Sequence, residues 1–103
     1  MPFYLYKSGR KNKKYVMVMP EFSHAHHFGD SRYEDFTTHK DPRRAEAYRA
    51  RSKSGAIDDV HAPAALSYYV LWAKPTLAGG IKSYEKKFGV DVVDRTNTTY
   101  TKK

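Results

Sequence analysis

The apolar stripe between residues 76 and 88 is the feature that most constrains how this 103-residue chain folds. Its members recur at i, i+4, i+7 and i+11, the repeat of one helix face: Leu77, Ile81, Tyr84 and Phe88. Gly89 follows as a C-terminal cap. The pair Gly79-Gly80 weakens a helix unless it permits close approach to a neighbour, for which we expect Trp72. The pattern predicts a helix over residues 76–88 that packs this stripe against a core.

The N-terminal part of the chain has the composition of β-strands. Residues 3–6 and 15–19 are β-branched and aromatic runs on either side of a basic loop with turn-forming residues, which predicts a hairpin. A third short strand is expected over residues 22–28, where alternate side chains would share one face: Phe22, His24, His26 and Phe28. Together these segments predict a small antiparallel sheet.

Two further helices are expected in the middle of the chain. Asp41-Pro42 is a typical helix start, so a short basic helix should run over residues 42–51. Residues 63–72 are apolar on nearly every side, which is typical of a buried helix. We therefore predict the α+β class, in which the antiparallel sheet is packed by two or three helices.

The length of the chain indicates one domain, which we place at residues 1–93. Residues 90–93 are expected to add an edge strand to the sheet. Residues 94–103 have no core-forming pattern, so they are expected to form a polar tail that becomes ordered only against a partner.

The charge of the chain favours anionic partners. Nineteen Lys and Arg against eleven Asp and Glu give a formal net charge of +8, which favours nucleic acid, a phospholipid surface or an acidic protein face. The absence of cysteine excludes disulfides, thiolate zinc sites and cysteine nucleophiles. No apolar run approaches the ~20 residues of a membrane-spanning helix, so no transmembrane segment is expected.

Histidines and carboxylates between residues 24 and 41 raise two chemical possibilities. A metal site could draw on six of them: His24, His26, His27, Asp30, His39 and Asp41. A strand sends neighbouring side chains to opposite faces, which works against such a site. His39 with Asp35 or Asp41 could form a general base with an orienting carboxylate, but no strained serine elbow accompanies it. We therefore expect no bound metal, no cofactor and no catalytic residue.

Two basic clusters, one in the helix at 42–51 and one in the hairpin loop, could bind phosphates or carboxylates. The residues expected to bind a polyanion or a protein interface are Arg43, Arg44, Arg49, Arg51, Lys11, Lys13, Lys14 and, in the tail, Tyr100. The helices at 63–72 and 76–88 also have the outline of a helix-turn-helix, although few side chains of the second could read bases. Tyr and Arg are enriched in buried protein interfaces, so protein partners are equally compatible with this composition.

Two blocks of sequence carry a pattern of known type. The first comprises Phe28, Gly29, Tyr33, Asp35, Phe36, Thr37, His39, Asp41, Arg44, Tyr48 and Arg51. The second comprises Leu71, Trp72, Lys74, Pro75, Thr76, Leu77 and Ile81. Both resemble a small uncharacterised protein family of nucleocytoplasmic large DNA viruses. The chain departs from that pattern at Ser52, where the family has His, and at Gly80, where it has Ser.

The resemblance implies a viral protein and brings no assigned activity. We expect a structural or assembly protein, a minor capsid (cement) component that contacts the major capsid protein or neighbouring minor capsid proteins. It would lie on the inner face of the capsid in the virion, and in the host cytoplasm during assembly. The alternative is a basic nucleic-acid-binding accessory protein, and a third possibility is a His/Asp-dependent hydrolase.

In the assembly interpretation, the polar block is structural. Its members would be Gly29, Tyr33, Asp35, His39, Asp41, Tyr48, Trp72 and Pro75. The two carboxylates would cap turns and the helix, the aromatic side chains would pack, and Arg44 would pair with a carboxylate.

Overall fold

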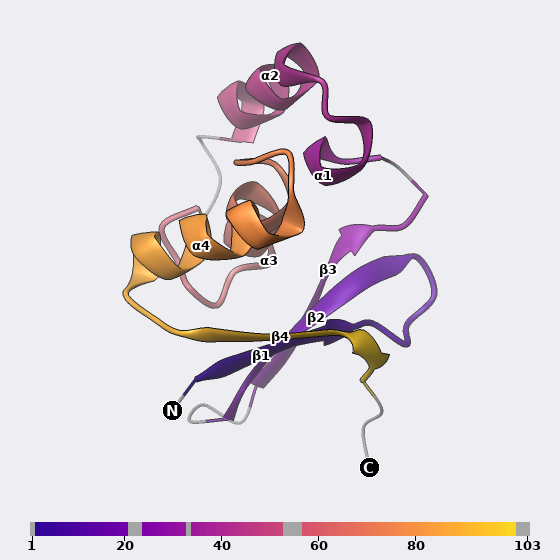
Figure 1. Cartoon of the computed structure of the whole chain (residues 1–103), viewed down its shortest axis with the longest axis vertical. Coiled ribbons are helices and arrows are strands. Elements are labelled where there is room, and N and C mark those ends of the chain that lie inside the picture. Colours follow the sequence, from indigo (N-terminus) through magenta and orange to yellow (C-terminus); the bar gives the residue numbers. More distant parts are fainter. Residues whose placement is uncertain (1, 21–23, 33, 53–56, 101–103) are drawn as a thin grey trace.

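The structure is a computed structural model of the chain, and it describes residues 2–20, 24–32, 34–52 and 57–100, with the side chain of His24 outside this description. Four strands form one sheet in the order β3-β2-β1-β4, and the helices lie on one side of it (Figure 1). The predicted α+β class is therefore confirmed.

Three of the strands are those expected from the N-terminal part of the chain. They are β1 (Phe3–Lys7), β2 (Lys13–Met19) and β3 (His24–Asp30). β1 and β2 pair antiparallel around a loop in which Asn12 adopts a left-handed conformation, with φ of 68°. β3 pairs antiparallel with β2. It begins at His24, and the expected earlier residue Phe22 lies outside the described residues.

The fourth strand corrects two expectations. β4 (Val92–Thr99) runs parallel to its neighbour β1, so the sheet is mixed rather than antiparallel. The strand also includes residues 94–99, for which the sequence predicts a polar tail that becomes ordered only against a partner. Backbone pairing explains this order: Phe3 N donates to Asp91 O and Tyr100 N donates to Lys7 O, each at 2.8 Å. Polar side chains can therefore occupy an edge strand without contributing to the core.

Five helical segments lie between β3 and β4 in the part of the chain that the structure describes. They are α1 (Phe36–His39), α2 (Pro42–Ser52), α3 (Pro63–Leu66), the π-helix η2 (Ser67–Leu71) and α4 (Leu77–Phe88). α1 was not expected, and the helix predicted over residues 63–72 is divided into α3 and η2. Asp41 caps α2 as predicted, because its Oδ1 accepts from Arg43 N at 3.0 Å. No helix among the described residues has the length and apolarity needed to cross a membrane.

The core lies between the sheet and the segments α3, η2 and α4. Its buried side chains are Phe3, Leu5, Met17, Met19, Phe28, Leu66, Val70, Leu71, Ile81 and Tyr84. The predicted stripe on α4 packs into it, with Ile81 and Tyr84 buried and Leu77 and Phe88 at its margin. Gly80 contacts the backbone of Val70 rather than Trp72, which corrects the expected neighbour. α2 lies at the far end from the sheet, beyond the other helices (Figure 1).

Candidate functional site

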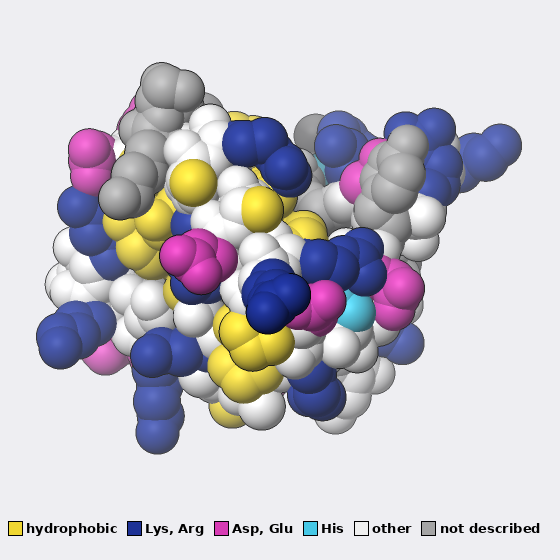
Figure 2. All heavy atoms as spheres, turned by 90° about the horizontal axis from the view of Figure 1, so that it is seen from above, with side chains coloured by type: hydrophobic (Ala, Val, Ile, Leu, Met, Phe, Trp, Pro, Cys, Tyr) yellow, Lys and Arg dark blue, Asp and Glu magenta, His cyan; other side chains and the backbone are white. Residues whose placement is uncertain are grey.

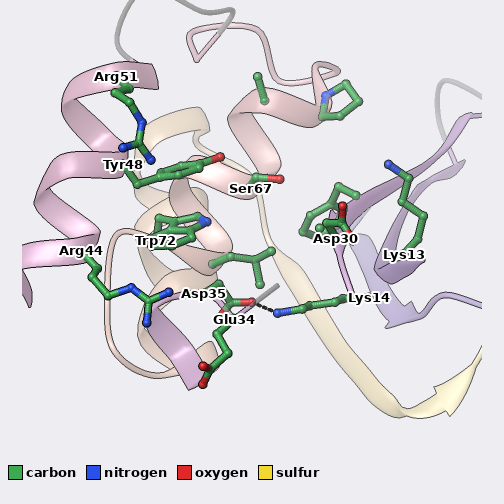
Figure 3. A pocket seen from close by; sticks show the side chains of 15 residues that line it. Lys13, Lys14, Asp30, Glu34, Asp35, Arg44, Tyr48, Arg51, Ser67 and Trp72 are labelled. Carbon is green, nitrogen blue, oxygen red and sulfur yellow. Dashed lines mark hydrogen bonds and ion pairs between the residues drawn. The ribbon is translucent and has the colours of Figure 1, made fainter. Parts of the chain in front are cut away.

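A cavity of about 520 Å³ opens between α2 and the adjoining ends of β2 and β3 (Figure 3). It is lined by Lys13, Lys14, Phe28, Gly29, Asp30, Glu34, Asp35, Arg44, Tyr48, Arg51, Pro63, Ala64, Ser67, Leu71 and Trp72. This volume is in the range of pockets that hold small ligands or short peptide segments. The cavity therefore brings together four of the predicted binding residues and four of the predicted structural motif.

The wall of the cavity on the α2 side is a pair of stacked rings. Tyr48 and Trp72 lie with centroids 4.1 Å apart and planes 9° from parallel. Arg49 donates from Nη1 to the carbonyl oxygen of Trp72 at 2.7 Å, which ties the same turn of α2 to the end of η2. Burial raises the pKa of the Tyr48 phenol, an effect that Ser52 and Arg51 partly offset. These contacts hold α2 in place although its own pattern is only weakly amphipathic.

The opposite side of the cavity contains an ion pair between β2 and the start of α1. Lys14 Nζ donates to Asp35 Oδ2 at 2.5 Å, and the Asp35 side chain is almost completely buried. Asp35 Oδ1 accepts from Thr37 N at 2.9 Å and also from the Thr37 hydroxyl, so the carboxylate caps α1. This agrees with the capping role that the sequence predicted for Asp35. It also means that the charge of Lys14 is neutralised within the protein.

Gly29 forms the floor where β3 passes beneath η2. Its φ is 78°, and a Cβ on it would lie 2.8 Å from Leu71 Cδ1 and 3.3 Å from Lys14 Cβ. A left-handed backbone with no room for a side chain explains why glycine is placed here. This close approach brings β3 and η2 together where Gly29 and Leu71 both line the cavity.

Arg44 and Arg51 extend from α2 beside the aromatic pair, and both side chains are largely exposed (Figure 3). We expected Arg44 to pair with a carboxylate, but among the described residues neither guanidinium forms an ion pair within the distance of a salt bridge. The reason is that Asp35 is already occupied by Lys14, and Asp30 by Arg32, whose Nη2 lies 2.9 Å from Asp30 Oδ2. Arg32 holds the pKa of Asp30 well below its usual range, at about 2. Arg44 and Arg51 are thus available to an anionic ligand.

The other predicted binding residues lie elsewhere. Arg43 and Lys11 are exposed and do not line the cavity, and Tyr100 lies against the other face of the sheet. Figure 2, viewed from the α2 end, shows Lys and Arg side chains spread over the surface with acidic and apolar side chains between them. The basic residues at this end therefore do not form one continuous positive surface.

The histidines are engaged with neighbouring groups rather than gathered at one point. His39 Nδ1 accepts from Asp41 N at 2.9 Å, so neither Asp35 nor Asp41 orients this ring through its carboxylate. His27 Nδ1 lies 2.6 Å from Ser8 Oγ, and the His26 ring lies 5.7 Å from His61. Within the described ranges, no group of three or more His, Asp or Glu side chains is placed to hold a metal ion.

The two remaining members of the predicted structural motif are Pro75 and Tyr33. The carbonyl oxygen of Pro75 accepts from Lys40 Nζ at 2.8 Å, which joins the end of α1 to the segment before α4. Tyr33 lies outside the described residues.

Sequence reasoning missed Glu34 and Ser67 as lining residues. Ser67 had a weak signal, because it interrupts an otherwise apolar and aromatic run at residues 63–72. The sequence carries no signal that marks Glu34 as a lining residue, since an acidic residue beside a turn is most often solvated. Their position at the cavity depends on how α1 and η2 meet, which no local pattern encodes.

Comparison with known proteins gives one match. Residues 4–52 match the model of a protein family of unknown function, DUF5754. The matched segment runs from β1 to the end of α2 and includes ten of the fifteen residues that line the cavity, the other five being in α3, η2 and Trp72. Neither the curated proteins nor the solved structures contain a match to the chain.

Proposed function

We propose that this protein is a structural or assembly protein, a minor capsid component of a large DNA virus, that binds an acidic segment of a neighbouring capsid protein in the cavity beside α2. The observation that carries the binding site is the position of Arg44 and Arg51 at the edge of an aromatic-walled cavity. Neither guanidinium group has a carboxylate partner among the described residues. The viral setting rests on the sequence resemblance.

The chemistry of the cavity suits a peptide with carboxylates. Arg binds carboxylates through two parallel hydrogen bonds, and Tyr, Trp and Arg are the residue types that contribute most to protein interfaces. The stacked Tyr48 and Trp72 offer an apolar wall for the chain of such a segment. Glu34 also lines the cavity, and it would repel a carboxylate placed next to it.

The test is a particle-incorporation experiment with charge-matched variants. Arg44→Gln/Arg51→Gln removes the two cavity arginines, and Arg43→Gln/Lys82→Gln removes two exposed charges elsewhere on the helices. Particles carrying either form are extracted with salt and then with detergent, and the protein is counted by quantitative mass spectrometry. We expect the cavity variant to be retained at less than a tenth of the wild-type copy number, because hot-spot truncations cost about 2 kcal/mol or more, and the control to be retained normally.

Two results would contradict the proposal. Equal retention of both variants would remove the cavity from the interaction, and absence of the wild-type protein from purified particles would remove the assembly role. Thermal unfolding of both variants serves as a control, since exposed substitutions of this kind change stability little.

A nucleic-acid-binding accessory role is the second candidate. It is favoured by the net charge of +8 and by tyrosine side chains on the side of the sheet away from the helices. A hydrolytic role for His39 gains no support from a ring whose Nδ1 accepts from a backbone N–H.

A further inference from the structure

The sheet has one face that no described helix covers (Figure 1). Phe3 and Leu5 of β1 point into the core beneath the helices, so the alternating side chains of Tyr4 and Tyr6 point to the opposite face. Both tyrosines are only half-buried. The open face therefore presents two aromatic rings from the inner strand β1, separated by about 6.6 Å along that strand.

A second group of rings is fixed beside Tyr6. The Tyr100 ring lies 5.5 Å from Tyr6 and 6.5 Å from His27, measured between centroids. Val16 pairs with Tyr6 on one side and with His27 on the other, and it is completely buried although it is not part of the core under the helices. Tyr6, His27 and Tyr100 therefore form a group of neighbouring rings on the open face.

The open face is cationic as well as aromatic. Arg95 of β4 lies over the Tyr4 ring, with Cζ 4.9 Å from the ring centroid. Lys7, Arg10 and Lys11 are exposed where β1 and β2 join. The pKa of His27 is lowered, mainly by burial and then by the charges of Arg10 and Lys13. Among the described strand residues that alternate onto this face with Tyr4 and Tyr6, none is acidic.

We infer that the open face of the sheet binds single-stranded nucleic acid. Unpaired bases would stack on Tyr6 and on the Arg95 guanidinium that lies over Tyr4, and phosphates would contact the cations at the β1–β2 end of the sheet. Aromatic side chains on an uncovered four-stranded sheet are one of the ways in which proteins bind unstacked bases, with basic residues tracking the backbone. Positive charge, with no carboxylate among the described strand residues of this face, favours a polyanion over an acidic or neutral protein surface as the occupant.

This site is separate from the cavity beside α2, because Tyr4, Tyr6, Tyr100 and Arg95 do not line that cavity. The inference therefore stands or falls independently of the proposed capsid contact. A double-stranded ligand is excluded as the preferred one, since paired bases cannot expose their faces to the tyrosines.

The test is fluorescence anisotropy of the full chain with a labelled 12-nucleotide oligo(dT) and with a duplex of equal length, over a salt series. We expect the single strand to bind at least tenfold more tightly than the duplex. Tyr4→Leu/Tyr6→Leu keeps apolar cover but removes both rings, and should weaken binding by tenfold or more, since each stacked base contributes a substantial factor. Arg95→Gln should weaken binding and reduce its salt dependence. Lys82→Gln, at an exposed position of α4, should change neither the affinity nor the salt dependence.

Three results would overturn the inference: equal affinity for duplex and single strand, unchanged affinity of Tyr4→Leu/Tyr6→Leu, or no binding by the wild type at low salt. Tyr4→Phe/Tyr6→Phe provides the matched control, because it retains the aromatic faces and should bind as the wild type does. Thermal unfolding distinguishes loss of binding from loss of the fold.

Discussion

Gly80 of α4 contacts the carbonyl group of Val70 in η2 so closely that a Cβ on Gly80 would overlap the Val70 oxygen and lie 2.7 Å from the carbonyl carbon. The obstacle is backbone, which cannot move aside as a flexible side chain would. The two helices therefore cross with their main chains in contact, and glycine is required by space rather than by an unusual φ.

Replacing Gly80 with alanine should destabilise the protein. Alanine is the better helix former by about 1 kcal/mol, but the forced separation of α4 and η2 should outweigh this gain and give a net loss of about 1–3 kcal/mol. Urea unfolding monitored by Trp72 fluorescence measures this change in the free energy of unfolding. Ala78→Ser, exposed on the same helix, is the control and should change little. A Gly80→Ala protein as stable as the wild type would contradict the close approach.

Asp35→Ala should strongly destabilise the folded protein. The change removes the cap of α1 and leaves the largely buried Lys14 ammonium without its partner, with an expected loss of about 2–4 kcal/mol. Asp30→Ala breaks an exposed pair with Arg32 and should have little effect. In a double-mutant cycle, Lys14→Met/Asp35→Ala should cost less than the sum of the single changes. A purely additive cycle would show that the pair is not coupled.

Tyr84 should make the protein sensitive to alkaline pH. Its hydroxyl donates to Val60 O at 3.0 Å, and burial, reinforced by Asp59, raises its pKa well above 10. Because the unfolded chain releases this proton first, stability should be constant below pH 10 and fall as the pH rises above it. Tyr84→Phe should lose about 1 kcal/mol at neutral pH and show a shallower alkaline decline. Urea unfolding at several pH values, with Tyr4→Phe as the control, separates the loss of the hydrogen bond from the change in pH dependence.

His27 should titrate below the ordinary histidine value of 6.5, because burial and then the charges of Arg10 and Lys13 lower its pKa. Its neutral form is favoured in the folded state, so its contribution to stability is present above pH 6.5 and is lost as the pH falls through the lowered value. NMR titration of the ring protons measures this pKa. Arg10→Gln should move it upward, whereas Arg43→Gln should leave it unchanged. A His27 pKa that Arg10→Gln leaves unchanged would contradict the influence of Arg10 on this ring.

The local patterns predicted the elements that depend on local interactions. The stripe from Leu77 to Phe88 specified α4, and Asp41-Pro42 specified the start of α2, since periodicity and caps act within a few residues. β4 could not be predicted beyond residue 93, because its order comes from backbone pairing with β1 rather than from its own side chains. A fourth strand that pairs parallel is not visible in the alternation of apolar residues.

The candidate site was predicted in its parts and not in its assembly. Arg44, Tyr48 and Trp72 were singled out from the sequence, but the stacking of Tyr48 on Trp72 joins segments that are 24 residues apart. The pairing of Lys14 with Asp35 spans 21 residues, and it leaves this carboxylate unavailable to Arg44. Such choices between competing partners depend on the tertiary structure. For this reason the sequence alone assigned Arg44 a carboxylate partner, which the described part of the chain does not provide.

The position of β1 between β2 and β4 has a consequence for the order of synthesis. β1 leaves the ribosome early and can pair with β2 at once, but its other edge stays without a partner until residues 92–99 have been made. A nascent chain that already contains the whole segment from β1 to α2 still exposes a line of free N–H and C=O groups to other chains. The sheet of this protein should therefore be completed only after β4 has been made, and slow translation of the segment between β1 and β4 should increase aggregation.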